Sequence, residues 1–413
     1  MLNMADKLIG AAIFGQSGGP TSVINASAYG VIKTALDAPE ITNVYGMDHG
    51  IVGVLNDTLY DMSKEDPHEL ELLLNTPSSA LGSCRYKLTD DEDLKRIHEI
   101  LEKYNIRYFF YNGGNDSMDT CSKISDYLSK VGYECRVMGV PKTIDNDLVG
   151  TDHCPGFGSA AKYIATSVAE VHKDAYVYNT GAITIMEIMG RNAGWLTAAS
   201  ALAELADAPP DLIYLPEIPF DMDKFLADVE SVYNEKNKCL IAISEGATYA
   251  DGSFITHATV SKTDGFGHAQ LGGTAATLAA VISNKLGVKT RPIELSLLQR
   301  CAAHMASQTD IDEAFLAGKS AVEHAVAGGT GKMVCFERET KNGEYHCNIA
   351  FEPLSVCANT EKKIPQEWIT ESGNYVTKEF IDYVLPLIQG ENHRKLENAL
   401  PRFAKLKKVK AEV

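Results

Sequence analysis

The sequence predicts an α/β protein built on mainly parallel sheets. Short apolar runs typical of strands alternate with longer amphipathic runs typical of helices, which is the order expected of a parallel sheet with helices on both faces. The predicted strand over 135–140 is apolar without alternation, as expected for a strand that is covered on both faces. The 413 residues suffice for two or three lobes of roughly 100–200 residues each.

The predicted elements follow one another from the N-terminus without a Pro- or Ser-rich linker. The segment over 90–104 is predicted as a helix because, after an acidic start, it repeats apolar residues at Leu94, Ile97, Ile100 and Leu101. The predicted helices are 23–36, 90–104, 117–130, 159–172, 193–206 and 222–233. The predicted strands are 8–14, 107–112, 135–140, 182–189, 212–215 and 239–244.

The C-terminal region has a different pattern. Two segments, 332–337 and 345–351, flank Asn342-Gly343, a dipeptide that favours a tight hairpin turn. The basic end over 402–410 is predicted to be the solvated face of a helix, in preference to a membrane or nucleic-acid contact.

The composition excludes several classes of protein. Apolar residues make up 45% and charged residues 23% of the chain, which is the balance of a globular protein and not of a disordered one. The net charge of −17 argues against a nucleic-acid partner, which requires a basic face. It also means that any polyanionic substrate needs a local basic site. No apolar run approaches the ~20 residues that span a membrane, so no membrane partner is expected.

Nine cysteines are scattered singly through the chain, and no C-x-x-C pair occurs. This usage favours reduced thiols in a cytoplasmic protein over disulfides or a zinc site.

The first chemical motif is a glycine-rich turn, Gly15-x-Ser17-x-Gly19, between a predicted strand and a predicted helix that Pro20 opens. Three interpretations stay open. The turn resembles the nucleophile elbow of a serine hydrolase, with Ser17 as the nucleophile. Its backbone N–H groups could instead hold a phosphate at the helix N-terminus. It could also be a purely structural tight turn.

The second motif repeats this layout, because Gly113-Gly114-Asn115-Asp116-Ser117 follows a strand and opens a helix. Ser117 is expected to cap the helix, while Asn115 and Asp116 offer oxygen ligands suited to Mg²⁺. A plain helix cap is the alternative. Two such turns after two parallel strands are expected to lie along one carboxyl edge of the sheet, where open α/β sheets bind ligands.

The third motif, Pro141-Lys142-Thr143-Ile144-Asp145-Asn146-Asp147, follows the strand that ends at residue 140 and is expected at the same edge. One lysine and two aspartates in six residues can hold an anion, a metal and a general base together. A solvated loop would carry similar charges, but Pro141 and Ile144 favour a fixed conformation.

Together, these segments resemble the phosphofructokinase family, and in particular its pyrophosphate-dependent type. The matching strings span residues 8 to about 334, and the Pro-x-Thr-Ile-Asp-Asn-Asp and Met-Gly-Arg strings are the most specific of them. In order, they are Gly-Gln-Ser-Gly-Gly-Pro at 15–20, Leu-Gly-Ser-Cys-Arg at 81–85, Gly-Gly-Asn-Asp-Ser at 113–117, Pro-Lys-Thr-Ile-Asp-Asn-Asp at 141–147, Met-Gly-Arg at 189–191, Ser-Glu at 244–245, Thr-Arg at 290–291 and Leu-Leu-Gln-Arg at 297–300.

The resemblance implies two Rossmann-like lobes with the active site in the cleft between them, so that 1–413 form a single catalytic unit. A diphosphate-binding lobe is expected from approximately 1–156 plus a later segment near 299–350. A sugar-phosphate lobe is expected from approximately 157–298 plus the C-terminal segment.

The resemblance also implies a role for each matching residue. Asp145 matches the proton acceptor for the sugar hydroxyl, Lys142 matches a group that binds diphosphate and stabilises charge, and Asp116 matches a group that excludes ATP. The implied diphosphate-binding residues are Gly18, Gly19 and Arg85. The implied sugar-phosphate-binding residues are Thr143, Ile144, Asp145, Met189, Gly190, Arg191, Glu245, Arg291, Leu297 and Arg300. Asn115 and Asp147 are the candidate Mg²⁺ ligands.

Two positions, Asp116 and Lys142, indicate diphosphate as the phosphoryl donor. The position of Asp116 is Gly in family members that use ATP, and the position of Lys142 is Gly in typical bacterial ATP enzymes.

Three other positions depart from the family pattern. Asn115 stands where an Asp is usual, Leu297 where His or Tyr is usual, and Ala182 where bacterial ATP enzymes have an Arg that reaches the neighbouring subunit.

The resemblance therefore implies a cytoplasmic homo-oligomer, a dimer or a tetramer. It would use Mg²⁺ and diphosphate to phosphorylate fructose 6-phosphate, reversibly, in glycolysis and gluconeogenesis. The nearest alternative is the ATP-dependent enzyme. Two alternatives from other classes are a serine hydrolase that uses Ser17 and a non-catalytic regulatory subunit. Activity on a related phosphosugar such as sedoheptulose 7-phosphate also stays open.

Overall fold

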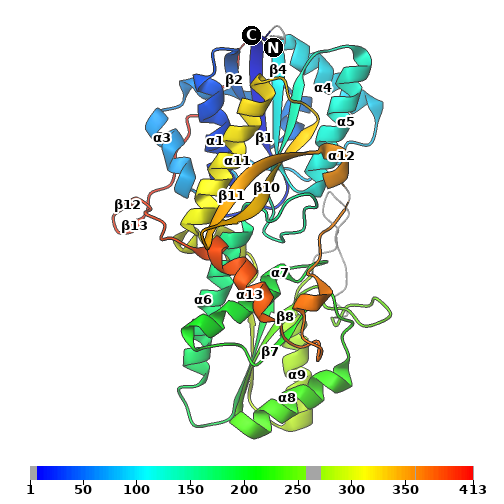
Figure 1. Ribbon diagram of the computed structural model, residues 1–413, viewed down its shortest axis with the longest axis vertical. Coiled ribbons are helices and arrows are strands. Elements are labelled where there is room, and N and C mark those ends of the chain that lie inside the picture. Colours follow the sequence, from blue (N-terminus) through cyan, green and yellow to red (C-terminus); the bar gives the residue numbers. More distant parts are fainter. Residues whose placement is uncertain (1–6, 257–270, 359, 413) are drawn as a thin grey trace.

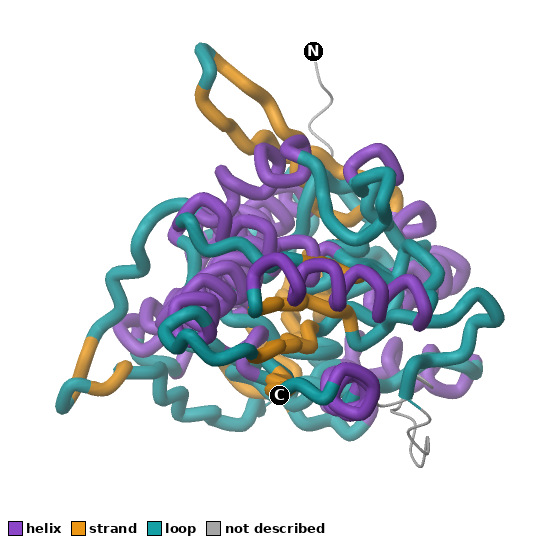
Figure 2. Tube along the Cα trace, turned by 90° about the horizontal axis from the view of Figure 1, so that it is seen from below, coloured by secondary structure: helices purple, strands orange, loops and turns teal. Residues whose placement is uncertain are grey.

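The computed structural model describes residues 7–256, 271–358 and 360–412, which form two lobes stacked along the long axis of the molecule (Figure 1). Each lobe is built on one sheet. Figure 2, which looks at the molecule from below, shows helices arranged around the strands. The predicted fold class, α/β with mainly parallel sheets, is confirmed.

The sheet of the first lobe has seven strands in the described residues, in the order β11-β10-β5-β4-β1-β2-β3. Its five central strands run parallel, and β3 and β11 pair antiparallel at the two edges. The strands are β1 (Gly10–Gln16), β2 (Ile41–Met47), β3 (Leu59–Asp61), β4 (Ile106–Gly113), β5 (Arg136–Pro141), β10 (Lys332–Lys341) and β11 (Glu344–Pro353). The helices of this lobe are α1 (Ile24–Asp37), α2 (Ile51–Leu55), α3 (Pro67–Glu71), α4 (Asp91–Lys103), α5 (Asn115–Val131), α11 (Gln308–Val326) and α12 (Leu354–Cys357).

Strand β4 shows why its sequence is apolar without alternation. Tyr108 and Phe110 are buried in a core with residues of α1 and α11, while Phe109 and Tyr111 are buried in a core with residues of α4 and α5. Because both faces of the strand are covered by helices, both sets of side chains are apolar or aromatic.

Helices α1 and α11 pack closely on one face of this sheet, and glycine permits their approach. A Cβ atom at Gly30 would lie 2.2 Å from the carbonyl oxygen of Phe315, and one at Gly318 would lie 2.1 Å from that of Ser27. This contact holds α11 in the first lobe, although the second lobe precedes it in the sequence.

The sheet of the second lobe has four parallel strands in the described residues, in the order β7-β8-β6-β9. They are β6 (Ala182–Ile188), β7 (Leu212–Tyr214), β8 (Lys238–Ser244) and β9 (Thr290–Glu294). The helices of this lobe are α6 (Phe157–Ala175), α7 (Trp195–Ala198), α8 (Met222–Lys236), α9 (Thr274–Leu286), α10 (Leu298–Cys301) and α13 (Lys378–Val384). The predicted helix over 193–206 consists of α7 and a 3₁₀ helix, Ala199–Ala206.

The basic end of the chain differs from the prediction. Residues 402–410 are not helical, and most of them have no regular secondary structure. This segment lies against the first lobe, where the carbonyl of Val409 accepts a hydrogen bond from Asp61 N (2.8 Å) and the carboxylate of Glu65 accepts one each from Lys407 N and Lys408 N (both 2.7 Å). These contacts satisfy the backbone that a helix would have satisfied internally.

The C-terminal segment is therefore divided between the lobes. Helix α13 packs in the core of the second lobe, whereas residues 402–411 return to the first lobe near β3, where we had not expected them. A two-stranded hairpin, β12 (Leu396–Glu397) and β13 (Leu400–Pro401), lies between these parts. No described helix has the length and apolar character needed to cross a membrane.

Candidate active site

A cavity of about 570 Å³ lies between the two lobes. It is lined by segments that follow the carboxyl ends of β1, β4 and β5 in the first sheet and of β6 and β8 in the second. Parallel strands carry their ligand sites at this edge because the loops there converge. The cavity brings together fourteen of the predicted site residues: Gly18, Gly19, Arg85, Asn115, Asp116, Lys142, Thr143, Ile144, Asp145, Asp147, Met189, Arg191, Glu245 and Arg300.

The turn after β1 carries Ser17, Gly18 and Gly19. Gly18 has a φ of +74°, which glycine adopts without strain. The carbonyl of Gly19 accepts a hydrogen bond from Lys142 Nζ at 2.7 Å, and a Cβ atom on Gly19 would lie 2.9 Å from Nη1 of Arg300. This turn therefore lies directly beside two cationic side chains.

Ser17 does not have the geometry of a hydrolase nucleophile. Its side chain is 2% exposed and lies outside the cavity lining. Its hydroxyl donates to the carbonyl oxygen of Cys84 at 3.5 Å, whereas a nucleophile elbow presents an exposed hydroxyl to a general base. The serine hydrolase alternative is therefore disfavoured.

The turn after β4 is very short, because Gly114 alone separates the strand from α5. Gly114 is the N-cap residue, so Ser117 lies inside the first turn of the helix and does not cap it as predicted. Asn115 Oδ1 accepts a hydrogen bond from the N–H of Asp116 at 3.2 Å. Asp116 stands at the positive end of the helix dipole, which stabilises its charge.

The loop after β5 carries Lys142, Asp145 and Asp147. Thr143 Oγ1 accepts a hydrogen bond from the N–H of Asp145 at 3.1 Å, which holds the residue in a turn. Asn146 is fully buried, with a φ of +53° that an asparagine tolerates better than most residues. Its side chain accepts from Cys154 N and donates to Tyr383 Oη, both at 3.0 Å, so the loop has the fixed conformation that its sequence predicts.

The charges of this loop perturb one another. Burial raises the pKa of Asp145 to about 7; Asp147 and Glu245 add to that rise, and Lys142 and Arg191 oppose it. Burial also lowers the pKa of Lys142 to about 8. The carboxylate and the ammonium group thus titrate close to neutral pH, as groups that exchange protons in catalysis commonly do.

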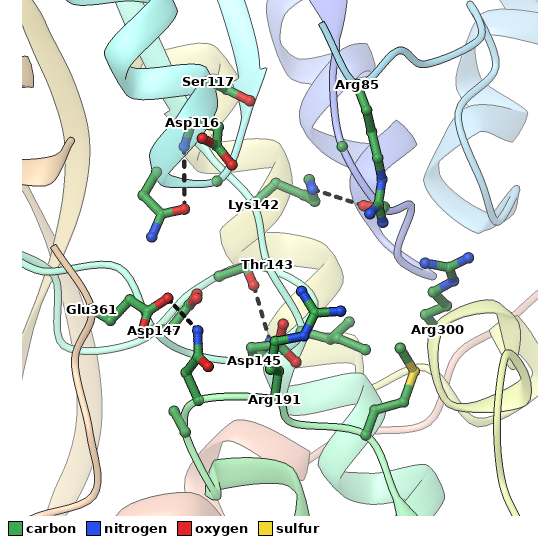
Figure 3. Close-up of a pocket in the computed structure, with 18 of the residues that line it drawn as sticks. Arg85, Asp116, Ser117, Lys142, Thr143, Asp145, Asp147, Arg191, Arg300 and Glu361 are labelled. Atoms are coloured by element: carbon green, nitrogen blue, oxygen red, sulfur yellow. Dashed lines mark hydrogen bonds between the residues drawn. The ribbon is translucent and has the colours of Figure 1, made fainter. Parts of the chain in front are cut away.

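The two sides of the cavity carry opposite charges (Figure 3). Arg85 and Arg300 lie on one side, whereas Asp116, Asp147 and Glu361 lie on the other. Burial lowers the pKa of Arg85, and the neighbouring Arg300 contributes to that shift. Several cations in one cavity form the local basic site that a polyanionic substrate of an acidic protein requires.

Three of the predicted sugar-phosphate residues do not line the cavity: Gly190, Arg291 and Leu297. Gly190 lies between two lining residues, but Arg291 is displaced because it pairs with Thr184, four residues and roughly 13 Å before the carboxyl end of β6. Its guanidinium forms an exposed ion pair with Asp174 at 2.9 Å. Leu297 is 57% exposed.

Seven lining residues are not among the predicted site residues. Pro20, Gly114 and Ser117 belong to the predicted glycine-rich turns, whereas four others lie outside the predicted motifs: Asn192, Ala193, Thr360 and Glu361. The first two follow Met-Gly-Arg directly, so extending that motif by two residues would have found them. No local pattern marks the last two, which reach the cavity from the C-terminal region. Asn192 Nδ2 donates to Glu361 Oε1 at 2.7 Å, so this pair joins the second lobe to that region.

One group of potential metal ligands lies elsewhere, where His153, Glu313 and Cys347 have ligand atoms within 4.8 Å of one another. Both nitrogens of His153 already have partners, Asp152 Oδ1 at 2.8 Å and Glu313 Oε2 at 2.7 Å. Asp152 also binds Arg338 through both carboxylate oxygens. These contacts are those of a buried charge network and leave the imidazole no nitrogen for a metal.

The sequence profile of the Phosphofructokinase family matches residues 11–311. The chain therefore belongs to the phosphofructokinase family. A relative from Halomonas elongata, named pyrophosphate--fructose 6-phosphate 1-phosphotransferase, is 45% identical over 409 residues. The match covers 97% of this chain and 97% of the relative. The crystal structure of pyrophosphate-dependent phosphofructokinase from Marinobacter aquaeolei matches with a TM-score of 0.89 and 42% identity, over 98% of both chains. An ATP-dependent 6-phosphofructokinase from Actinobacillus pleuropneumoniae is 30% identical and covers 66% of this chain.

Proposed function

We propose that this protein transfers a phosphoryl group from diphosphate to the C1 hydroxyl of fructose 6-phosphate, giving fructose 1,6-bisphosphate and phosphate. One observation carries the proposal: the side chains of Asp116, Lys142 and Asp145 line one cavity that also holds several arginines. The names of the relatives that match nearly the whole chain support the same donor. The ATP-dependent alternative has the support of more distant and partial matches.

In the proposed reaction Asp145 accepts the proton of the C1 hydroxyl as that oxygen attacks phosphorus. The bond between the transferred phosphorus and its bridging oxygen breaks, and phosphate leaves. Lys142, with Arg85, neutralises the charge on the donor and on the leaving phosphate, and Arg300 helps to bind the sugar phosphate. Arg191 binds the 6-phosphate of the sugar phosphate, and Glu245 binds one of its hydroxyl groups.

Asp116 is proposed to select the donor. Its carboxylate would oppose the α-phosphate of a nucleotide, and its side chain would occupy the space that a nucleotide needs. Diphosphate ends before that point and avoids both penalties. Because diphosphate hydrolysis is less favourable than ATP hydrolysis, the reaction is expected to run in both directions.

The residues present fit a Mg²⁺ ion. Asp147 offers carboxylate oxygens at the cavity, and Asn115 offers an amide oxygen that already accepts one hydrogen bond and keeps a second lone pair. When bound, the ion would add positive charge at the phosphoryl groups. A homo-oligomeric state and a cytoplasmic location also remain part of the proposal.

The proposal is tested by initial rates with fructose 6-phosphate and Mg²⁺, with diphosphate or ATP as the donor. Turnover with diphosphate and little with ATP is expected, together with diphosphate formation from fructose 1,6-bisphosphate and phosphate. Strong turnover with ATP and none with diphosphate would establish the alternative donor. A protein that binds the sugar phosphate but turns over with neither donor would be a regulatory subunit. Sedoheptulose 7-phosphate in place of fructose 6-phosphate tests the acceptor.

A further inference from the structure

A short segment of the C-terminal region, residues 360–364, crosses from one lobe to the other at the rim of the cavity. We call it the strap. On its first-lobe side, the N–H of Lys362 donates to the carbonyl of Asp147 at 2.7 Å, and Glu361 forms an isolated antiparallel bridge with Leu148. The strap is thereby attached to the backbone of the loop after β5, directly beyond Asp145 and Asn146.

The side chain of Lys362 binds the far end of the same loop. Its Nζ donates to the carbonyl oxygens of Thr151 (3.1 Å) and Asp152 (2.6 Å), and it lies 5.2 Å from the centre of the Trp195 ring. Burial lowers the pKa of this ammonium group, while nearby Asp152 and Asp147 oppose the shift. An ammonium group that donates to two main-chain carbonyls holds a loop, because its loss would remove the donor to Thr151 and one of the two donors to Asp152.

The strap is attached to the second lobe by three further contacts. Trp195 Nε1 donates to the carbonyl of Lys362 at 3.0 Å. Glu361 accepts from Asn192, as described above, and Ile364 N donates to Glu217 Oε1 at 3.3 Å. The same oxygen of Glu217 accepts from Gly194 N at 2.8 Å. The strap thus connects the loop after β5 to the segment after β6.

A chain of hydrogen bonds leads from the strap to the reacting groups. The carbonyl of Asp152, which Lys362 binds, also accepts from Tyr383 Oη at 2.6 Å. Tyr383 Oη in turn accepts from Asn146 Nδ2 at 3.0 Å. Asn146 stands between Asp145 and Asp147, the proposed proton acceptor and the proposed metal ligand, so any shift of this network moves both carboxylates.

We propose that the strap fixes the loop of Asp145 and Asp147 against the second lobe, and that Lys362 is a positioning residue for the reaction. The proposal rests on the proposed function for the meaning of Asp145. The strap lies outside residues 11–311, the part of the chain that the family profile matches. The proposal therefore concerns the C-terminal region of this chain. The hydrogen-bond and ring contacts of Lys362 given above do not include Arg85 or Arg300 on the cationic side of the cavity. Loss of this side chain is therefore expected to lower kcat more than it raises the KM for diphosphate.

The test compares Lys362→Met with Lys363→Met, a neighbouring lysine whose side chain is exposed. Lys362→Met is expected to lower kcat by about 10- to 100-fold, the scale of a small misplacement of a reacting group, and to change KM for diphosphate by less than about threefold. Lys363→Met is expected to match the wild type. Equal kcat in the two variants, or a loss that appears only in KM, would overturn the proposal.

A second variant guards against a folding defect. Tyr383→Phe removes one hydroxyl, which is the other donor to the carbonyl of Asp152, and keeps the aromatic packing. It is expected to lower kcat in the same direction, and the two effects are expected to be less than additive when combined, because both act on one carbonyl. Fully additive losses would mean that the two side chains act separately and would overturn the network.

A third measurement needs no turnover. The chain has two tryptophans, so Trp368→Phe leaves Trp195 as the only fluorescent indole. In that background Lys362→Met is expected to shift the Trp195 emission in the absence of substrate, and Lys363→Met is not. Failure of diphosphate turnover in the wild type would refute the proposed function alone, whereas an unchanged Trp195 emission would refute the strap alone.

Discussion

The turn after β4 and the loop after β5 lie side by side in the first sheet, yet they hold their functional side chains in different ways. The turn has one residue, Gly114, between strand and helix, so local backbone geometry places Asp116. The loop runs from Lys142 to Gly156, and distant parts of the chain hold it. Tyr383 and Lys362 bind its interior, and Asp310 accepts from Gly156 N (2.9 Å) at its end.

This difference separates Asp116, which is proposed to select the donor, from Asp145, which is proposed to take part in the reaction itself. A change in the turn alters one side chain on a helix that stays in place. A change in the loop disturbs contacts with several segments, and Asp145 moves with them. We therefore expect the loop variants to have large effects on rate and the turn variants to have smaller effects on the choice of donor.

The largest effect is expected from Asp145→Asn, which keeps the shape of the side chain and removes its basicity. The kcat value should fall by roughly 10²- to 10⁴-fold, the range of general base catalysis, while fructose 6-phosphate still binds by calorimetry. The exposed Asp126→Asn on α5 is the control, and it should leave kcat unchanged. A kcat within tenfold of the wild type would show that another group accepts the proton.

The next effect is expected from Lys142→Met, which removes a cation from the same loop. The kcat value should fall by about 10²- to 10³-fold because the charge on the phosphoryl group loses its partner. Since Lys142 lowers the pKa of Asp145, its removal should raise that pKa and move the acid limb of the pH–rate profile to higher pH. The exposed Lys130→Met serves as the control, and an unmoved acid limb would disprove the coupling.

The pH dependence of the wild type is a third expected outcome. Asp145 must lose its proton to act, and its pKa is about 7. Below that pH, kcat/KM should therefore rise about tenfold for each unit by which the pH increases. Lys142 must keep its proton, so kcat/KM should fall above a pKa of about 8. A flat profile from about pH 6 to 9 would contradict both assignments.

The smallest effect is expected from Asp116→Gly in the turn. Turnover with ATP should increase by about tenfold, the effect of removing one repulsion of about 1.4 kcal/mol, and turnover with diphosphate should change less. Asp116→Asn removes the charge and keeps the size, so the pair of variants separates repulsion from crowding. No gain with ATP in either variant would place donor selection elsewhere.

The sequence predicts well those features that local chemistry determines. The hairpin at Asn342-Gly343 forms as expected, with φ values of +55° and +85° that this dipeptide adopts readily. Strand β4 begins and ends within one residue of its predicted bounds, because a doubly covered strand has a continuous apolar run. The three motifs at the carboxyl edge likewise meet in one cavity, because parallel strands place them there.

Features that depend on distant contacts are the ones that the sequence did not predict. Strand β9 contains Pro292 and charged residues, and it has no apolar run because it lies at the edge of its sheet. Arg291 on this strand matches the family pattern but stands away from the carboxyl edge. Glu361 carries no local signal, since its place follows from the bridge to Leu148, more than 200 residues earlier. The tail over 402–410 is not helical, and Glu65 binds its backbone instead, which its basic composition does not reveal.

The position of β10 in the first sheet has a consequence for the order in which the protein is completed during synthesis. All strands of the second sheet lie between residues 182 and 294, so that sheet can assemble as soon as this stretch has emerged. The first sheet begins at residue 10 but receives β10 and β11 only after residue 353. Until then the backbone groups of β5 that pair with β10 have no partner, and exposed strand edges favour aggregation. The half of the protein that is made first is therefore the half that needs protection for longest.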